Sequence, residues 1–161
     1  MLDLGPVCGE NINFFGQRVK RLFVCDMFLR LDLAHRNGLP LTQAWQHLDY
    51  TPQSFDGILL WGLIDYLEDH EVRKLLGLCN TMLRPSGTLL AVVQDEYSVA
   101  SEVNSYVIGE DFGVYIRPQP HLRLSLGRRH NRALLALVAP FTPFKSFIYR
   151  DGVREILLRP S

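Results

Sequence analysis

The first fifteen residues, MLDLGPVCGENINFF, constrain the fold of this chain more than any other stretch. They read as a short apolar strand, then a turn with Gly5 and Gly9, then an apolar-faced helix. Glycines let the backbone approach another group closely, and the N-terminus of a helix offers unpaired N–H groups. This order is typical of an α/β protein with a ligand above the turn, although an ordinary strand-to-helix turn has the same pattern.

The spacing of these glycines argues against two common nucleotide loops. Laid on Gly5, the dinucleotide fingerprint G-x-G-x-x-G requires glycine where this chain has Val7 and Glu10. The phosphate loop G-x-x-x-x-G-K-[ST] does not fit the stretch either. An NAD-dependent oxidoreductase is therefore disfavoured.

Composition narrows the class of partner. The 161 residues, 47% hydrophobic and 21% charged, are typical of one globular domain with a sizeable core. Seventeen basic and seventeen acidic residues cancel, so the chain lacks the positive field that holds proteins on a phosphate backbone. We expect no general nucleic-acid binding.

The cysteines and the apolar runs indicate a cellular compartment. Cys8, Cys25 and Cys79 form no C-x-x-C pair, so we expect buried thiols in a reducing compartment, without disulfides or a metal site. No apolar run is long enough to span a bilayer and no signal peptide precedes the first strand, so we expect a cytoplasmic protein. Because the chain opens directly on that strand, either a preceding segment is absent or the domain is minimal.

Buried-strand and helix patterns alternate along the chain. Apolar runs at 21–26, 55–61 and 88–93 predict strands. A helix with Ile12, Phe15 and Val19 on one face is expected over 11–20. A second one over 69–83 carries apolar residues at helical spacing. The alternation predicts a doubly wound, mostly parallel sheet, although no clean third strand is visible between 28 and 54.

The end of the chain breaks this alternation. A short helix is expected over 131–141, followed by strands at 144–150 and 153–159 that Asp151-Gly152 joins as an antiparallel hairpin. The long connection 94–132 mixes tyrosines with arginines and is a candidate cap over a binding site. It could also be a solvated basic surface, and Val114 to Arg117 could pair with Leu122 to Leu126.

Asp26 closes the second apolar run, about 20 residues beyond the glycine turn. Ligands of open α/β sheets lie outside the carboxyl ends of the strands, where a carboxylate can accept both ribose hydroxyls. Asp26 is therefore a candidate nucleoside ligand, and a solvated strand-end residue is the alternative.

These features resemble the class I S-adenosylmethionine-dependent methyltransferases. The family pattern D-x-G-x-G-x-G, laid on Asp3, finds Asp3, Gly5 and Gly9 and misses only the middle glycine, which is Val7. The stretches 54–59 and 83–90 and the closing hairpin follow in the family's order. The resemblance spans nearly all of residues 1–161 and implies a methyltransferase-like Rossmann fold with S-adenosyl-L-methionine as cofactor.

Carried over residue by residue, the resemblance implies a set of cofactor contacts. Asp3, Gly5 and Gly9 would lie by the methionine part and Asp26 by the ribose. Asp49 is the nearest candidate for the acid beside the adenine. Trp61 and Gly62, after the fourth strand of the family, would line the pocket near the sulfonium.

Methyl transfer is an in-line displacement, so positioning supplies much of the acceleration and a base is needed only if the acceptor loses a proton. Asp65, Tyr66 and His70 follow Trp61 and are the catalytic candidates, although Tyr66 could simply pack and His70 could be solvated. The Asn/Asp-Pro-Pro-aromatic motif of many amino-group methyltransferases is absent. The resemblance therefore disfavours DNA adenine and protein glutamine as acceptors and leaves a small molecule or another protein side chain. A domain that binds or assembles without catalysis is the alternative.

Overall fold

The computed structural model describes residues 1–94, 102–149 and 152–161. The strands are β1 (Leu2–Asp3), β2 (Phe23–Val24), β3 (Phe55–Trp61), β4 (Leu83–Gln94), β5 (Asn104–Ile108), β6 (Val114–Pro118), β7 (Phe141–Ile148) and β8 (Val153–Pro160). The helices are α1 (Gly9–Gly16), α2 (Met27–Arg36), α3 (Thr42–Trp45), α4 (Asp69–Met82) and α5 (Asn131–Leu137), with short 3-10 turns η1 (Gln46–Leu48) and η2 (Leu63–Tyr66).

The main sheet has six strands in the order β2-β1-β3-β4-β8-β7. The first four are parallel, β8 is antiparallel to β4, and β7 is antiparallel to β8. This confirms the predicted doubly wound, mostly parallel sheet with a closing antiparallel hairpin. Of the turn in that hairpin, Asp151 lies outside the described residues, and so does Tyr97 of the expected cap.

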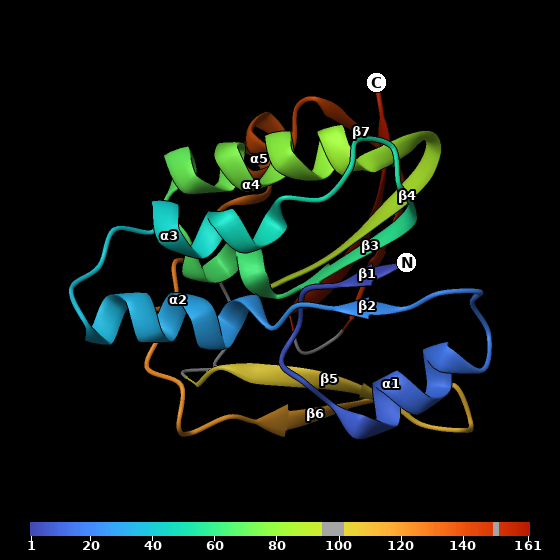
Figure 1. The fold of residues 1–161 in the computed structure, drawn as a ribbon, viewed down its shortest axis with the longest axis horizontal. Helices are drawn as coiled ribbons and strands as arrows, with labels where there is room; N and C mark the ends of the chain where they lie inside the picture. The colour runs from blue at the N-terminus through green and yellow to red at the C-terminus, as the bar shows by residue number, and fades with distance from the viewer. Residues whose placement is uncertain (95–101, 150–151) are drawn as a thin grey trace.

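Helices and a second, two-stranded sheet cover the main sheet. In Figure 1, α3, α4 and α5 lie on one side, whereas α1 and the β5–β6 hairpin lie on the other. β3 alternates between the sides: Ile58 and Leu60 belong to one apolar cluster, while Leu59 and Trp61 belong to a second. This alternation gives the molecule two separate cores.

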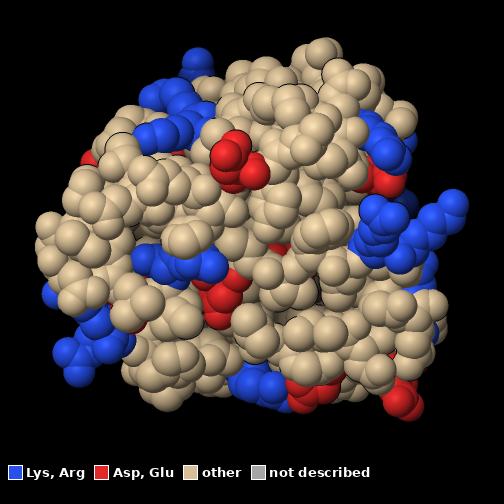
Figure 2. Space-filling model, viewed as in Figure 1, with Lys and Arg blue, Asp and Glu red and all other residues tan. Residues whose placement is uncertain are grey.

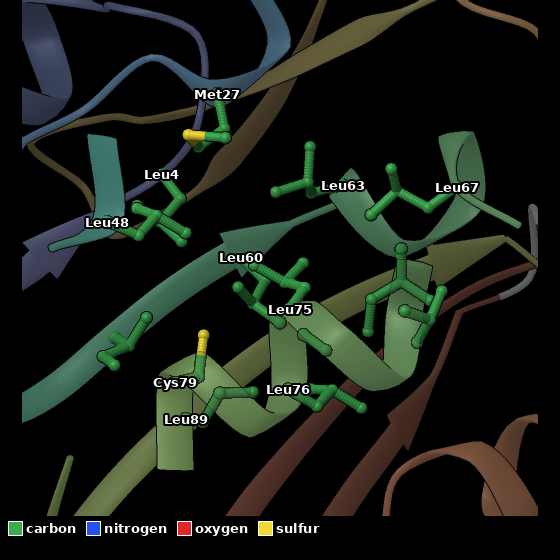
Figure 3. Packing of buried hydrophobic residues seen from close by; sticks show 14 of the residues in the cluster. Leu4, Met27, Leu48, Leu60, Leu63, Leu67, Leu75, Leu76, Cys79 and Leu89 are labelled. Carbon is green, nitrogen blue, oxygen red and sulfur yellow. The ribbon is translucent and has the colours of Figure 1, made fainter. Parts of the chain in front are cut away.

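The larger core lies under α4. Its residues Val72, Leu75, Leu76 and Cys79 are all fully buried, as the helical spacing predicted. Figure 3 shows Leu75, Leu76 and Cys79 in the same packed cluster as Leu60 of β3 and Leu63 of η2. α4 ends at Met82, one residue before the predicted end.

Three predictions about local structure are wrong. Val114–Pro118 pairs with Asn104–Ile108 and not with the segment 122–126, because the partner strand starts ten residues earlier in a stretch without clear alternation. Phe141 begins β7 instead of ending the preceding helix, since α5 stops at Leu137. On α1, Ile12 is 38% exposed, whereas Asn11 is buried.

The missing third strand is a property of the fold. Residues 37–54, all of which the structure describes, hold α3 and η1 and no strand, so β2 is an edge strand of two residues. The absence of a strand pattern in this part of the sequence therefore agrees with the structure.

The surface and the cysteines agree with the composition. Cys8, Cys25 and Cys79 are free and buried. On the face shown in Figure 2, basic and acidic residues form small groups separated by uncharged ones. None of the helices in the described part of the chain is long and apolar enough to cross a bilayer.

Candidate functional site

The glycine turn and Asp26 lie against one another at the carboxyl edge of the sheet. One oxygen of Asp26 accepts a hydrogen bond from the backbone N–H of Leu29 at 2.9 Å and so caps α2. The other oxygen accepts the N–H of Val7 at 3.0 Å. Since each carboxylate oxygen can accept two hydrogen bonds, Asp26 retains acceptor capacity beside the turn.

The carboxylate of Asp3 is hydrogen-bonded to two groups of the protein itself. Its Oδ1 accepts the N–H of Gly5 at 2.9 Å and the indole Nε1–H of Trp61 at 2.7 Å, and the residue is only 4% exposed. Burial raises the pKa of Asp3, while these two hydrogen bonds act in the opposite direction. Asp3 therefore joins the turn to the end of β3.

The two glycines of the turn meet different surroundings. A Cβ at Gly5 would lie 2.3 Å from Cδ1 of Trp61, so position 5 must be glycine for the indole to lie where it does. A Cβ at Gly9 would meet nothing within 4 Å. In this structure the side chain that needs Gly5 is Trp61.

Two aromatic side chains fill the space beside Gly5. Trp61 has a φ of 51°, a conformation that bulky residues rarely adopt, and its ring stacks on that of Tyr106 with centroids 6.1 Å apart. The two rings are inclined by only 9°, and both residues are 5% exposed or less. Gly62 lies beneath the stack, because a Cβ there would lie 3.6 Å from Tyr106.

The β5–β6 hairpin is fastened to α1 by polar bonds. The Asn11 amide donates to the carbonyl of Tyr106 and accepts the N–H of Ile108, both at 2.8 Å. At the surface, Glu10 pairs with Arg117 at 2.6 Å. The hydrogen bond from Arg117 lowers the pKa of Glu10 to about 2, so the pair persists through the ordinary pH range.

The three catalytic candidates differ in accessibility. Asp65 is 2% exposed and accepts the N–H of Gln94 at 2.7 Å, and burial raises its pKa to about 7. Tyr66 donates to the carbonyl of Glu102 at 3.4 Å, and burial raises its pKa to about 12. His70 is exposed on the first turn of α4.

A cleft of about 820 Å³ separates the second half of α2 from the start of α4. Tyr66 and His70 line it, but Asp65 does not. Its floor is apolar, and its charged lining includes Glu68, Arg123 and Arg129. Arg129 is held by Asp69 at 2.9 Å and by the carbonyl of Ile64.

Asp49 follows η1 near the short strand β2, where the carbonyl of His47 lies 4.0 Å from the thiol of Cys25. The ring of the adjacent Tyr50 packs against Phe23 and Phe55, the first residues of β2 and β3. These strands begin at the edge of the sheet opposite the glycine turn, since β1, β2 and β3 are parallel. The other cofactor candidates, from Asp3 to Gly62, lie at the carboxyl edge.

Sequence reasoning missed Asn11. The residue carries little signal of its own, because it is the third residue of α1 and a polar residue is ordinary in the first turn of a helix. Its partners, however, are backbone groups 95 and 97 residues away, which no local pattern reveals.

No protein-family model matches the chain, and no curated protein matches its sequence. Solved structures match its fold. An S-adenosylmethionine-dependent methyltransferase from Mesorhizobium loti is 13% identical over 98% of this chain and 89% of that chain, with a TM-score of 0.63. The 1,6-didemethyltoxoflavin-N1-methyltransferase of Burkholderia thailandensis, with bound S-adenosylhomocysteine, is 17% identical over 99% and 70%, with a TM-score of 0.58.

The PH0226 protein of Pyrococcus horikoshii is 12% identical, with a TM-score of 0.51. The match covers 94% of this chain and 64% of that protein's chain. At such identities the likeness shows the fold, which is that of the class I methyltransferases.

Proposed function

We propose that this protein binds S-adenosyl-L-methionine at the carboxyl edge of its sheet and transfers the methyl group to a small molecule or a protein side chain. The observation that carries the proposal is the position of Asp26, whose carboxylate lies 3.0 Å from the N–H of Val7 in the glycine turn. In a methyltransferase-like fold, an acid and a glycine turn that a ligand can approach closely then lie together at the carboxyl edge of the sheet. This is the edge where ligands of open α/β sheets lie.

The residues at this edge fit the cofactor in part. Asp26 would hold the ribose hydroxyls. Gly9, with open space around it, would let the turn run close to the methionine part. At Gly5 and Asp3 the fit requires that the indole of Trp61 move away, because it occupies the space beside both. When bound, the cofactor supplies an electrophilic methyl group, and the chain's own task is to position the acceptor.

The cleft beside α4 is the acceptor site in this proposal. Tyr66 borders it and also lies next to Gly62, where a Cβ would lie 3.9 Å from its ring, so it connects the cleft with the end of β3. With a pKa of about 12, its phenol stays protonated at neutral pH and can orient the acceptor by a hydrogen bond. His35 and His70 also line the cleft and offer imidazole nitrogens to an acceptor. We also propose a cytoplasmic location for this protein, as expected from its sequence.

Calorimetry with S-adenosylhomocysteine tests the cofactor. We expect saturable heat for the wild type and at least about tenfold weaker binding for Asp26→Asn, since a hydrogen bond to a charged group contributes about 1.5 to 3 kcal/mol. Asparagine can keep the cap of α2 through its single carbonyl oxygen, but its NH2 group then faces the N–H of Val7, so the variant loses the bond to the turn together with the charge. Asp56→Asn, at an exposed acid of β3, is the matched control. No heat from the wild type well above micromolar concentration would contradict the proposal.

One observation favours a second candidate, a domain of this fold that binds or assembles without catalysis. The indole of Trp61, on which Tyr106 stacks, occupies the space beside Gly5 that the cofactor requires. Transfer of a radiolabelled methyl group to any acceptor in a panel of small molecules and protein extracts would exclude this candidate. Cofactor binding with no transfer to the whole panel would favour it.

A further inference from the structure

We propose that the β5–β6 hairpin is a lid that closes the nucleoside site of this protein with the protein's own side chains, and that Asn11 is its latch. This inference rests on the proposed function, because it concerns access of the cofactor to the same site. It follows from three features: the rings beside Gly5, the bonds that hold β5 to α1, and the exposure of β6.

The first feature is the occupant of the site. With Cδ1 of Trp61 at 2.3 Å and Nε1 at 2.7 Å from a Cβ at Gly5, no ligand atom can contact this glycine while the indole is in place. Tyr106 of β5 stacks on the indole, with the ring centroids 6.1 Å apart. The indole therefore leaves Gly5 only if Tyr106, and with it β5, moves away from the sheet.

The second feature is the latch. The side chain of Asn11 imitates a neighbouring strand: it donates to one carbonyl of β5 and accepts one N–H, at the carbonyl of Tyr106 and the N–H of Ile108. Asn11 is 3% exposed, so both bonds are shielded from water. While the lid is closed, the Asn11 amide is hydrogen-bonded to the Tyr106 carbonyl and to the Ile108 N–H. Opening replaces these bonds with hydrogen bonds to water.

The third feature is the outer side of the hairpin. All five residues of β6 are exposed, including Val114, Tyr115 and Ile116. The lid therefore meets the rest of the protein through β5, through the ion pair between Arg117 and Glu10, and through the ring of Phe112, which packs on Phe14 of α1 with centroids 5.6 Å apart. Elements with few buried contacts are those that open locally at the lowest free energy.

These features have a kinetic consequence. If the cofactor binds only after the hairpin detaches, its association rate and apparent affinity scale with the fraction of open molecules. Weakening the latch must then speed association, whereas weakening a contact elsewhere on α1 must not.

The test compares Asn11→Ala with Asn13→Ala. Asn13 lies on the same helix and is exposed, and its side-chain oxygen accepts a hydrogen bond from the side chain of Gln17 at 3.1 Å. Two quantities are measured: hydrogen exchange of the β5 amides without ligand, and the association rate of S-adenosylhomocysteine by stopped flow. For Asn11→Ala we expect both to rise about tenfold, the ratio that about 1.4 kcal/mol gives. For Asn13→Ala we expect neither to change.

Each other result overturns something specific. Faster exchange of β5 with an unchanged association rate overturns the lid and leaves the proposed function standing. Faster exchange with no binding by wild type or variant overturns the proposed function, and the gating of the cofactor with it. Unchanged exchange of β5 overturns Asn11 as the latch. Should Asn11→Ala fail to fold by circular dichroism, Arg117→Gln at the exposed ion pair provides the same two measurements.

Discussion

The two faces of the sheet are joined to the elements that cover them in different ways. On one face, α4 contributes an unbroken apolar stripe to a cluster that also takes in side chains of β3, β4, β8 and α5. On the other, the cluster has four buried members, Leu59, Trp61, Val92 and Tyr106, and the covering hairpin is held by an asparagine and an exposed ion pair.

This difference separates what holds the fold from what controls access to the site. Apolar burial is non-directional and contributes in proportion to area, so the α4 face stabilises the whole domain. Hydrogen bonds exchange with water at small net free energy, so the hairpin face can open without unfolding the rest. Substitutions on the two faces should therefore have different effects.

The largest effect is expected for Leu75→Ala on the α4 face. Leu75 is fully buried, so the substitution removes apolar contacts and leaves a cavity, at a cost of about 2 to 5 kcal/mol in the free energy of unfolding. The exposed neighbour Lys74→Ala is the control and should change it by less than about 0.5 kcal/mol. Urea denaturation measures both, and similar values for the two variants would break the comparison.

Asp65→Asn tests the polar residue on the turn that leads into α4. Because burial raises the pKa of Asp65 from 3.8 to about 7, the folded state holds a proton that the unfolded state has lost between these values. Stability from this group is complete below pH 4 and falls as the pH rises towards 7. The loss is at most about 4 kcal/mol, at about 1.36 kcal/mol per pKa unit.

Asparagine is uncharged at every pH and can still accept the N–H of Gln94. We therefore expect Asp65→Asn to flatten the decline in the free energy of unfolding between pH 4 and 7 and to be the more stable protein at pH 8. Denaturation at a series of pH values measures this. A variant that keeps the wild-type slope would show that Asp65 is charged in the folded state.

A pair of glycine variants tests the hairpin face. Gly5→Ala places a methyl group 2.3 Å from Trp61, so the indole or the turn must shift, at a cost of about 1 to 3 kcal/mol. Gly9→Ala meets open space at the start of α1 and should be neutral or slightly stabilising. Unfolding curves and tryptophan fluorescence report both. Equal effects would mean that the indole does not depend on Gly5.

The elements that could be predicted from the sequence are those fixed by local pattern. α4 and β3 carry their signals in helical spacing and in a continuous apolar run, and the closing hairpin carries its signal in a two-residue turn. The gap in the pattern between 28 and 54 also corresponds to a real absence, since no strand forms in 37–54. Where the pattern was read too far, as at Phe141, the boundary was wrong.

The site was less accessible to sequence reasoning. The glycine turn and Asp26 were recognised because both end apolar runs, and the structure brings them together. The reason for Gly5 could not be recognised, because Trp61 is 56 positions away and β5, which holds the stacked ring, has no signal of its own. Asp49 was chosen by sequence distance alone, and it lies between His47, next to Cys25, and Tyr50, which packs on Phe23.

The smallest effect is expected for Glu10→Gln, which removes the charge from the exposed pair with Arg117. Both side chains are about half exposed, so we expect no measurable change in the unfolding midpoint. Hydrogen exchange of the β5 amides should nevertheless rise slightly, because the pair holds the hairpin and not the core. Since salt screens exposed charges, raising the ionic strength should speed this exchange in the wild type and not in the variant.

Asp56→Asn is the control for this measurement, because Asp56 forms an exposed pair of the same length, 2.6 Å, with Arg84, far from the hairpin along the chain. It should leave the exchange of β5 unchanged at every salt concentration. If both variants had the same effect on β5, the Glu10–Arg117 pair would have no particular role in holding the hairpin. The two faces would then differ only in how much apolar surface each buries.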